Sequence, residues 1–162
     1  MKLINVTPDL PTVLRELSAA PCWDAQRGYG SFLTFDFGAR TTRAGRWGPH
    51  EVGEIHLWIY MAAWNLKVDG RRVGWCSTPE KKDWALQRFL GRTITGFSEH
   101  PACVTFSGEG DAHITLNPLP EYEDEDRGED RGKDRGKDRG EAESELFMLF
   151  LPGKRVVSGF WG

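Results

Sequence analysis

Cysteine and long apolar runs are both scarce in this chain of 162 residues. Its three cysteines, Cys22, Cys76 and Cys103, form no closely spaced set, which argues against a disulfide framework. The longest run without a charged residue or histidine, 57–66, is about half of the roughly 20 residues that a membrane-spanning helix needs. The first residues also lack a charged-then-apolar leader. These absences predict a reduced, cytoplasmic protein without a membrane segment.

Recognisable catalytic motifs are absent as well. The chain has only four histidines and no nucleophile elbow, phosphate-binding glycine loop or paired-histidine helix. A zinc site assembled from His100, Cys103 and His113 is disfavoured, because one strand would place His100 and Cys103 on opposite faces. We therefore expect no metal and no cofactor, and the sequence favours a binding protein over an enzyme.

Charge is unevenly distributed along the chain. Residues 121–145 contain twelve acidic and six basic residues, including a repeated Asp-Arg-Gly unit, and leave the remainder with a net charge of +3. We interpret 121–145 as a flexible, disordered charged insertion within a single domain, 1–162. It is either an acidic docking arm for a basic partner or an expansion tolerated in a loop. The weak, scattered basicity elsewhere argues against binding to nucleic acid.

The apolar spacing predicts an α+β fold, in which two helices pack on an antiparallel, strongly twisted sheet. A helix begins near Asp9 and ends before Pro21, and a second begins with a capping box at Ser77-Thr78-Pro79-Glu80 and ends at Gly91. Strands are expected at 31–38 and 54–68, with a loop over 39–53 between them. Asp69-Gly70 predicts a tight hairpin turn. Three short strands follow the second helix, and 146–151 and 155–161 form a last hairpin.

The segment 54–68 has large apolar residues at both odd and even positions. We interpret it as one long central strand, buried on both faces. One alternative is that a second copy of the chain covers one of these faces, which would make the protein a homodimer.

Aromatic and arginine side chains supply the candidate binding residues. Two pairs, Trp23 with Arg27 and Trp47 with Arg46, lie in loop-like segments. The further aromatics Trp58 and Tyr60, with His56, could line a pocket between helix and sheet. The carboxylates of Asp36, Glu51 and Glu54 form a weaker acid–base candidate. The predicted binding residues are Trp23, Arg27, Arg46, Trp47, Trp58 and Tyr60.

Several segments together suggest a family likeness: GSFLTFDFG, EIHLWIYMAAWNLKVDGRRVGWCS, FLGRTITGF, ACVTFSGEGDAHITLNP and LFMLFLPGKRVV. Over 30–157, without the insertion, the chain resembles small bacterial α+β proteins found beside polymorphic toxins, where they act as immunity proteins. The resemblance implies a cytoplasmic protein that neutralises a protein partner by binding, and it assigns no functional residues. The alternatives are a small-ligand-binding protein or small enzyme, and a self-associating structural subunit.

Overall fold

Most of the chain is extended, and its strands pair with neighbours that run in the opposite direction. The computed structural model describes residues 2–4, 10–30, 32–45, 48–119, 144–151 and 155–161. In chain order the elements are β1 (Lys2–Ile4), α1 (Leu10–Ser18), β2 (Cys22–Arg27), β3 (Leu33–Gly45), β4 (Gly48–Ile59), β5 (Ala62–Val68), β6 (Arg71–Gly74), α2 (Pro79–Phe89), β7 (Ile94–His100), β8 (Cys103–Gly108), β9 (His113–Pro118), β10 (Ser144–Leu151) and β11 (Arg155–Trp161). The predicted antiparallel α+β class with two helices is confirmed.

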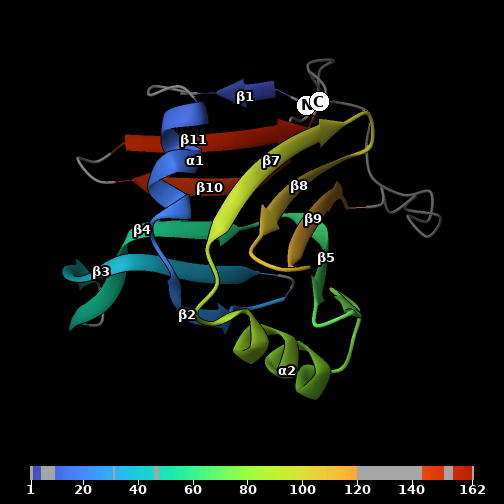
Figure 1. Cartoon of the computed structure of the whole chain (residues 1–162), viewed down its shortest axis with the longest axis horizontal. Coiled ribbons are helices and arrows are strands. Elements are labelled where there is room, and N and C mark those ends of the chain that lie inside the picture. The colour runs from blue at the N-terminus through green and yellow to red at the C-terminus, as the bar shows by residue number, and fades with distance from the viewer. Residues whose placement is uncertain are drawn as a thin grey trace, which may run out of the picture.

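The strands divide into two sheets. One has six strands in the order β1-β11-β10-β4-β3-β2, and the other has five in the order β6-β5-β9-β8-β7. Figure 1 shows β7 crossing in front of the six-stranded sheet, with α1 beside it, while α2 lies at the lower end in contact with β2, β5 and β6. Among the described residues, no helix is both long and apolar enough to cross a membrane.

The core lies between the two sheets and under the helices. Phe106 of β8 meets Phe147 of β10 edge to face, with ring centroids 5.0 Å apart, and so joins the five-stranded sheet to the six-stranded one. The α1 side chains Val13 and Leu17 are fully buried, as the helical spacing predicted. Burying these apolar surfaces is the main contribution to stability, at roughly 25 cal/mol for each Å² removed from water.

The predicted single strand over 54–68 is wrong, because the chain changes sheets at Tyr60 and Met61. Before this break the buried side chains have odd numbers, and after it they have even numbers: Ile55, Leu57 and Ile59, then Ala62, Trp64, Leu66 and Val68. Each half therefore has one buried face, as a strand of a two-layer structure should. The apparent burial of both faces came from joining two strands that are out of phase.

The predicted loop over 39–53 is also wrong, since β3 and β4 stay paired from Arg40↔Gly53 to Gly45↔Gly48. Most side chains in this outer part of the hairpin are exposed, so the sequence has no buried face to reveal a strand. Strand β2 also differs from the predicted loop-like segment around Trp23 and Arg27, for a similar reason. It is short, and a register shift between Cys22 and Asp24 interrupts its alternation.

The turn and helix boundaries follow local chemistry more closely. Asp69 and Gly70 have φ of 50° and 72°, which confirms the predicted hairpin turn. Gly91 follows α2 with φ of 81°, as expected for a residue after a helix. The capping box is wrong in detail, because Thr78 precedes α2 but makes no side-chain bond to the helix backbone. Of the predicted insertion 121–145, only Ser144 and Glu145, at the start of β10, lie within the described residues.

Candidate functional site

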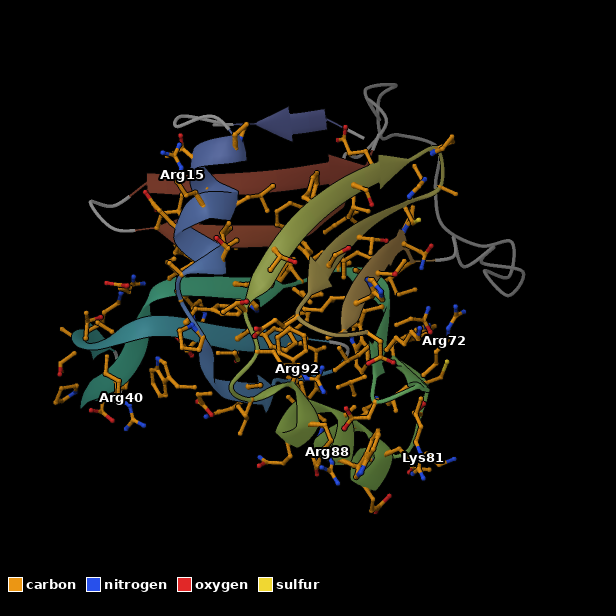
Figure 2. All side chains as sticks on the ribbon, in the orientation of Figure 1. Arg15, Arg40, Arg72, Lys81, Arg88 and Arg92 are labelled. Carbon is orange, nitrogen blue, oxygen red and sulfur yellow. The ribbon has the colours of Figure 1, made fainter. Side chains whose placement is uncertain are left out.

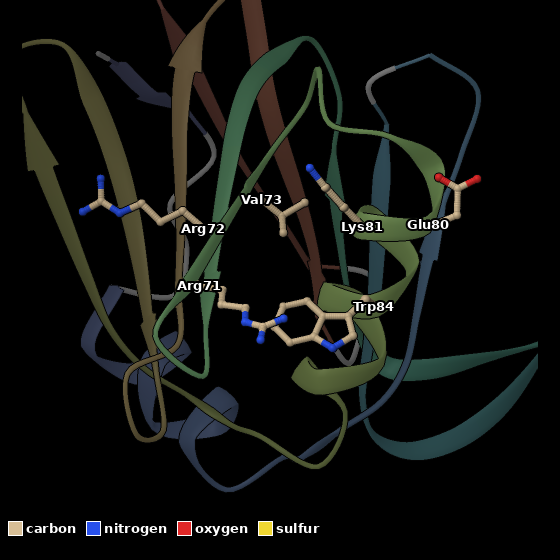
Figure 3. Close-up of a pocket in the computed structure, with 6 residues that line it drawn as sticks. All are labelled: Arg71, Arg72, Val73, Glu80, Lys81 and Trp84. Atoms are coloured by element: carbon tan, nitrogen blue, oxygen red, sulfur yellow. The ribbon is translucent and has the colours of Figure 1, made fainter.

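A groove with a cavity volume of about 510 Å³ lies between β6 and the first turns of α2. Figure 3 shows Arg71 of β6 facing Trp84 of α2, with Lys81 above them, whereas Arg72 and Glu80 project outward at the two edges. Val73 is 4% exposed and forms part of the apolar floor, and the half-buried Trp84 extends that floor from the helix. The rim is polar and charged. The lining residues are Arg71, Arg72, Val73, Glu80, Lys81 and Trp84.

The β5–β6 turn, from which β6 leads into the groove, is held by hydrogen bonds to the rest of the molecule. The Asp111 carboxylate accepts hydrogen bonds from the backbone N–H of Gly70 at 2.6 Å and of Asp69 at 3.1 Å. These bonds, that from Gly70 above all, lower the pKa of Asp111 because they stabilise the charged carboxylate. The Asp69 side chain in turn accepts from Arg92 and pairs with Arg88 at 3.7 Å. The turn thus fixes where β6 begins.

Positive charge at the groove is not neutralised by neighbouring carboxylates. The Arg71 guanidinium lies over the Trp84 ring, 5.1 Å from its centroid, and the Lys82 ammonium lies 5.7 Å from the Trp64 centroid. Across the described ranges, neither these two cations nor Arg72 and Lys81 lie within 4 Å of a carboxylate. Figure 2 shows Arg72 and Lys81 projecting from the same side of the molecule, away from Arg15.

The one carboxylate in the groove is already engaged. Hydrogen bonds from its own backbone N–H and from the Thr78 hydroxyl lower the pKa of Glu80, so the charged form is held at the start of α2. The groove therefore combines an apolar floor, the ring of Trp84 and an excess of positive charge.

The structure separates the residues that the sequence grouped together. Trp23 lies in β2 under the Arg40 guanidinium, 4.5 Å from its ring centroid. Arg27, at the other end of β2, instead makes a two-pronged ion pair with Asp83 of α2, at 2.6 Å and 3.1 Å. That hydrogen bond raises the pKa of Arg27 and lowers the pKa of Asp83. The other predicted pair, Arg46 and Trp47, lies outside the described residues.

Trp58 and Tyr60 do come together, on the outer face of the six-stranded sheet and not between helix and sheet. Tyr60 stacks on Phe32 with ring centroids 4.7 Å apart, and Trp58 meets Tyr60 edge to face at 5.3 Å. His56 lies on the same strand face as Trp58, beside a second cavity. Neither Trp58 nor Tyr60 lines the β6–α2 groove.

Sequence reasoning missed the groove, although part of its signal was present. Arg71-Arg72 follow the predicted turn, and Lys81-Lys82 fall in the first turn of the predicted helix. Their proximity depends on how α2 docks beside β6, which periodicity does not reveal.

Metal-binding geometry is not found among the described residues, where no three His, Cys, Asp or Glu side chains are arranged to hold an ion. His100 and Cys103 pair across β7 and β8, so they share a face, contrary to the expectation for a single strand. Both line a cavity of about 510 Å³ with His113 on the outer face of the five-stranded sheet. No family model matches the chain, and comparison with curated proteins and with solved structures finds no match.

Proposed function

We propose that this chain is a non-enzymatic module that binds a protein partner through the β6–α2 groove. One observation carries the proposal: Arg71, which has no carboxylate partner among the described residues, lies over a half-buried tryptophan in a groove with an apolar floor and further cations at its rim. The segment that fits this chemistry is acidic and carries an apolar side chain, which would enter beside Trp84 while its carboxylates meet Arg72 and Lys81.

The residue types suit this role energetically. Trp and Arg dominate the small set of residues that contribute most to protein interfaces, where they act in pockets that exclude water. Arg71 is held over the Trp84 ring, so less side-chain entropy is lost when a partner orders it. The surrounding positive charge should accelerate association with an acidic segment and make the affinity sensitive to salt.

The proposal extends to an immunity-like role, in which the bound partner is neutralised. The resemblance to immunity proteins supports a partner that is inactive while bound. A reducing, cytoplasmic location agrees with the free thiols of Cys22, Cys76 and Cys103. Co-expression with a candidate toxin encoded nearby tests the role directly, since growth should be restored by the wild-type chain and lost again with a groove variant.

The groove is tested by affinity capture from nuclease-treated lysate of the source cells, followed by titration of the recovered partner in purified form. Lys81→Glu and Arg72→Glu each reverse one rim charge, and Arg15→Glu reverses an exposed charge on α1 as the matched control. Each groove variant should weaken the purified complex at least about tenfold, because like charges meet across a desolvated contact. Arg15→Glu should leave the affinity unchanged.

Three results would contradict the proposal. Equal weakening by Arg15→Glu would mean that net charge, and not the groove, controls binding. Unchanged affinity in Lys81→Glu and Arg72→Glu would place the contact elsewhere. Failure of the wild-type chain to retain any single protein at low or physiological salt would remove the support for a protein-binding role.

Self-association remains a separate prediction, but its premise does not hold. It rested on a second apolar face of one long strand, and that strand is two strands with one buried face each. The small-ligand alternative is favoured by a specific observation, the polar cavity beside His56.

A further inference from the structure

A second cavity, of about 410 Å³, lies on the outer face of the six-stranded sheet, and it is independent of the β6–α2 groove. Its floor consists of side chains from the middle of β2, β3, β4 and β10, and one wall consists of Arg43, His50 and Glu51 from the outer part of the β3–β4 hairpin. A register shift between Phe37 and Arg40 separates these two parts of the hairpin. Such bulges bend a strand pair, which explains how both parts reach one cavity.

Asp36 and His56 form a hydrogen-bonded pair at the floor of this cleft. Asp36 is 6% exposed, and its Oδ1 lies 2.8 Å from His56 Nδ1 and accepts a bond from the Gly53 N–H at 2.6 Å. A carboxylate only accepts hydrogen bonds, so Nδ1 carries the proton, and in the tautomer that has this single proton Nε2 is left as an acceptor. Within the described residues Nε2 has no hydrogen-bond partner. Asp36 therefore orients the His56 ring, as a carboxylate orients a histidine in many sites, and the pair presents one acceptor to the cleft.

Aromatic rings border the same cleft. Trp58 lines it beside His56, and Phe150 of β10 lies against the His56 ring with centroids 5.9 Å apart. Trp58 is fixed from its other side by Phe32, which meets it edge to face at 6.3 Å. A rigid aromatic wall next to polar groups suits a ligand with one apolar face and several polar edges.

The polar groups restrict the ligand further. Asp24 and Glu51 add carboxylates to that of Asp36, and Arg43 is the one Lys or Arg among the described lining residues. The excess of carboxylates disfavours an anion such as phosphate, and an ammonium ion would leave the hydrogen-bond donors of Arg43 without an acceptor. Hydroxyl groups both donate and accept, so they fit a mixed set of carboxylate, imidazole and guanidinium partners.

We propose that this cleft is a saccharide-binding site, in which a sugar ring lies against Trp58 and one of its hydroxyl groups donates to Nε2 of His56. Asp36 is a positioning residue that sets the tautomer and orientation of His56. The proposal does not depend on the protein-binding role of the groove, because the two sites share none of their described lining residues.

Asp36 also has a structural role, since it ties Gly53 to the bulge. A test must therefore observe the ligand and not only stability. The experiment follows ¹⁵N-labelled wild-type protein by NMR during titration with methyl glycosides of glucose, galactose, mannose and N-acetylglucosamine. Inorganic phosphate and tetramethylammonium are titrated in parallel. The reporters are the Trp58 indole N–H, the Gly53 amide and His56 Nε2, whose shift changes when it accepts a hydrogen bond.

At least one glycoside should shift all three reporters in a saturating manner, while the His113 resonances stay constant. His56→Phe keeps a ring beside Phe150 but removes the acceptor, so the affinity should fall about tenfold, the equivalent of one hydrogen bond. The affinity of Trp58→Ala for the glycoside, followed through the Gly53 amide, should fall by a similar factor. His113→Phe, a histidine replacement on the outer face of the other sheet, should bind as wild type does.

The proposal is overturned if no glycoside in the panel shifts Trp58 and His56. It is equally overturned if phosphate or tetramethylammonium saturates these reporters when the glycosides do not, or if His56→Phe and Trp58→Ala bind the glycoside as tightly as the wild type. Because the wild-type shifts of His56 Nε2 need no substitution, the test stands even if one variant does not fold.

Discussion

The ring of Phe35 in β3 meets the ring of Phe89 in α2 at a centroid distance of 5.1 Å and an interplanar angle of 63°. Both side chains are fully buried, so this edge-to-face contact joins the six-stranded sheet to the helix that forms one side of the groove. The position of α2, and with it that of Trp84, depends on this contact.

Phe35→Ala should therefore lower the free energy of unfolding by about 3–5 kcal/mol, because it removes buried apolar surface and leaves a cavity. Urea denaturation at neutral pH measures the change. Tyr29→Ala is the control, since Tyr29 is 93% exposed and its removal should stay within about 0.5 kcal/mol. A similar loss in both variants would contradict the contact described here.

Gly53→Ala tests the close approach of β3 and β4 at the bulge. A Cβ at this position would lie 2.6 Å from both the backbone N and O of Phe37, and these atoms cannot move as a side-chain end can. We expect a loss of about 1–3 kcal/mol, typical of overpacking. Gly96→Ala is the matched control in β7, where the nearest atom, Cβ of Ser107, is 3.4 Å away. Equal stabilities of the two variants in thermal or urea unfolding would rule out this steric reason.

Asp111 should make stability depend on pH in the acid range. Its folded pKa is lowered below the usual 3.8 by the Gly70 and Asp69 amides. The bonds stabilise the fold fully above the unfolded pKa, and this stabilisation is lost as the pH falls through the lower folded pKa. Asp111→Asn removes the titration, so its stability should fall less steeply than that of the wild type as the pH drops below about 4. Urea midpoints measured across this range give the comparison, and parallel curves would contradict it.

The three thiols should react with iodoacetamide at different rates. Burial raises the pKa of Cys22 to about 12, so it has almost no reactive thiolate near pH 8, whereas Cys76 is exposed. Peptide mass spectrometry should find Cys76 modified first and Cys22 modified only after denaturation. Rapid labelling of Cys22 in the native protein would contradict its burial.

The raised pKa of Cys22 also predicts a loss of stability in the alkaline range. Because its folded pKa is raised, the protonated thiol is compatible with the fold, and stability is lost as the pH rises from the ordinary 9.0 towards about 12. Cys22→Ala lacks this titration, so its stability should decline less steeply over the same range. Urea midpoints above pH 9 compare the two proteins.

Elements with strong local signals were predicted well. The Asp69-Gly70 turn, the helix that ends before Gly91, and the alternation of Leu33, Phe35 and Phe37 all follow from conformational preference or from one buried face. Elements with weak local signals were not predicted from the sequence. The outer β3–β4 hairpin exposes most of its side chains, and β2 is too short and irregular to show a period.

The candidate sites were harder to predict than the fold. Trp58 and Tyr60 were identified as binding residues because of their type, but their partner Phe32 and the neighbouring Asp36–His56 pair come from strand pairing. Arg27 was grouped with Trp23 because the two are close in sequence, although its side chain binds Asp83 of α2. Proximity along the chain says little about which side chains share a surface.

The sequence by itself determined the class of this protein: alternating apolar residues and turn-forming pairs are local properties, and they commit the chain to antiparallel strands and two helices. Only the tertiary structure decided that the strands form two sheets, with the crossing at Tyr60 and Met61. The same holds for the groove beside Trp84 and the cleft at His56. Each is assembled by packing between segments distant in the chain, and that packing depends on long-range contacts that no local pattern encodes.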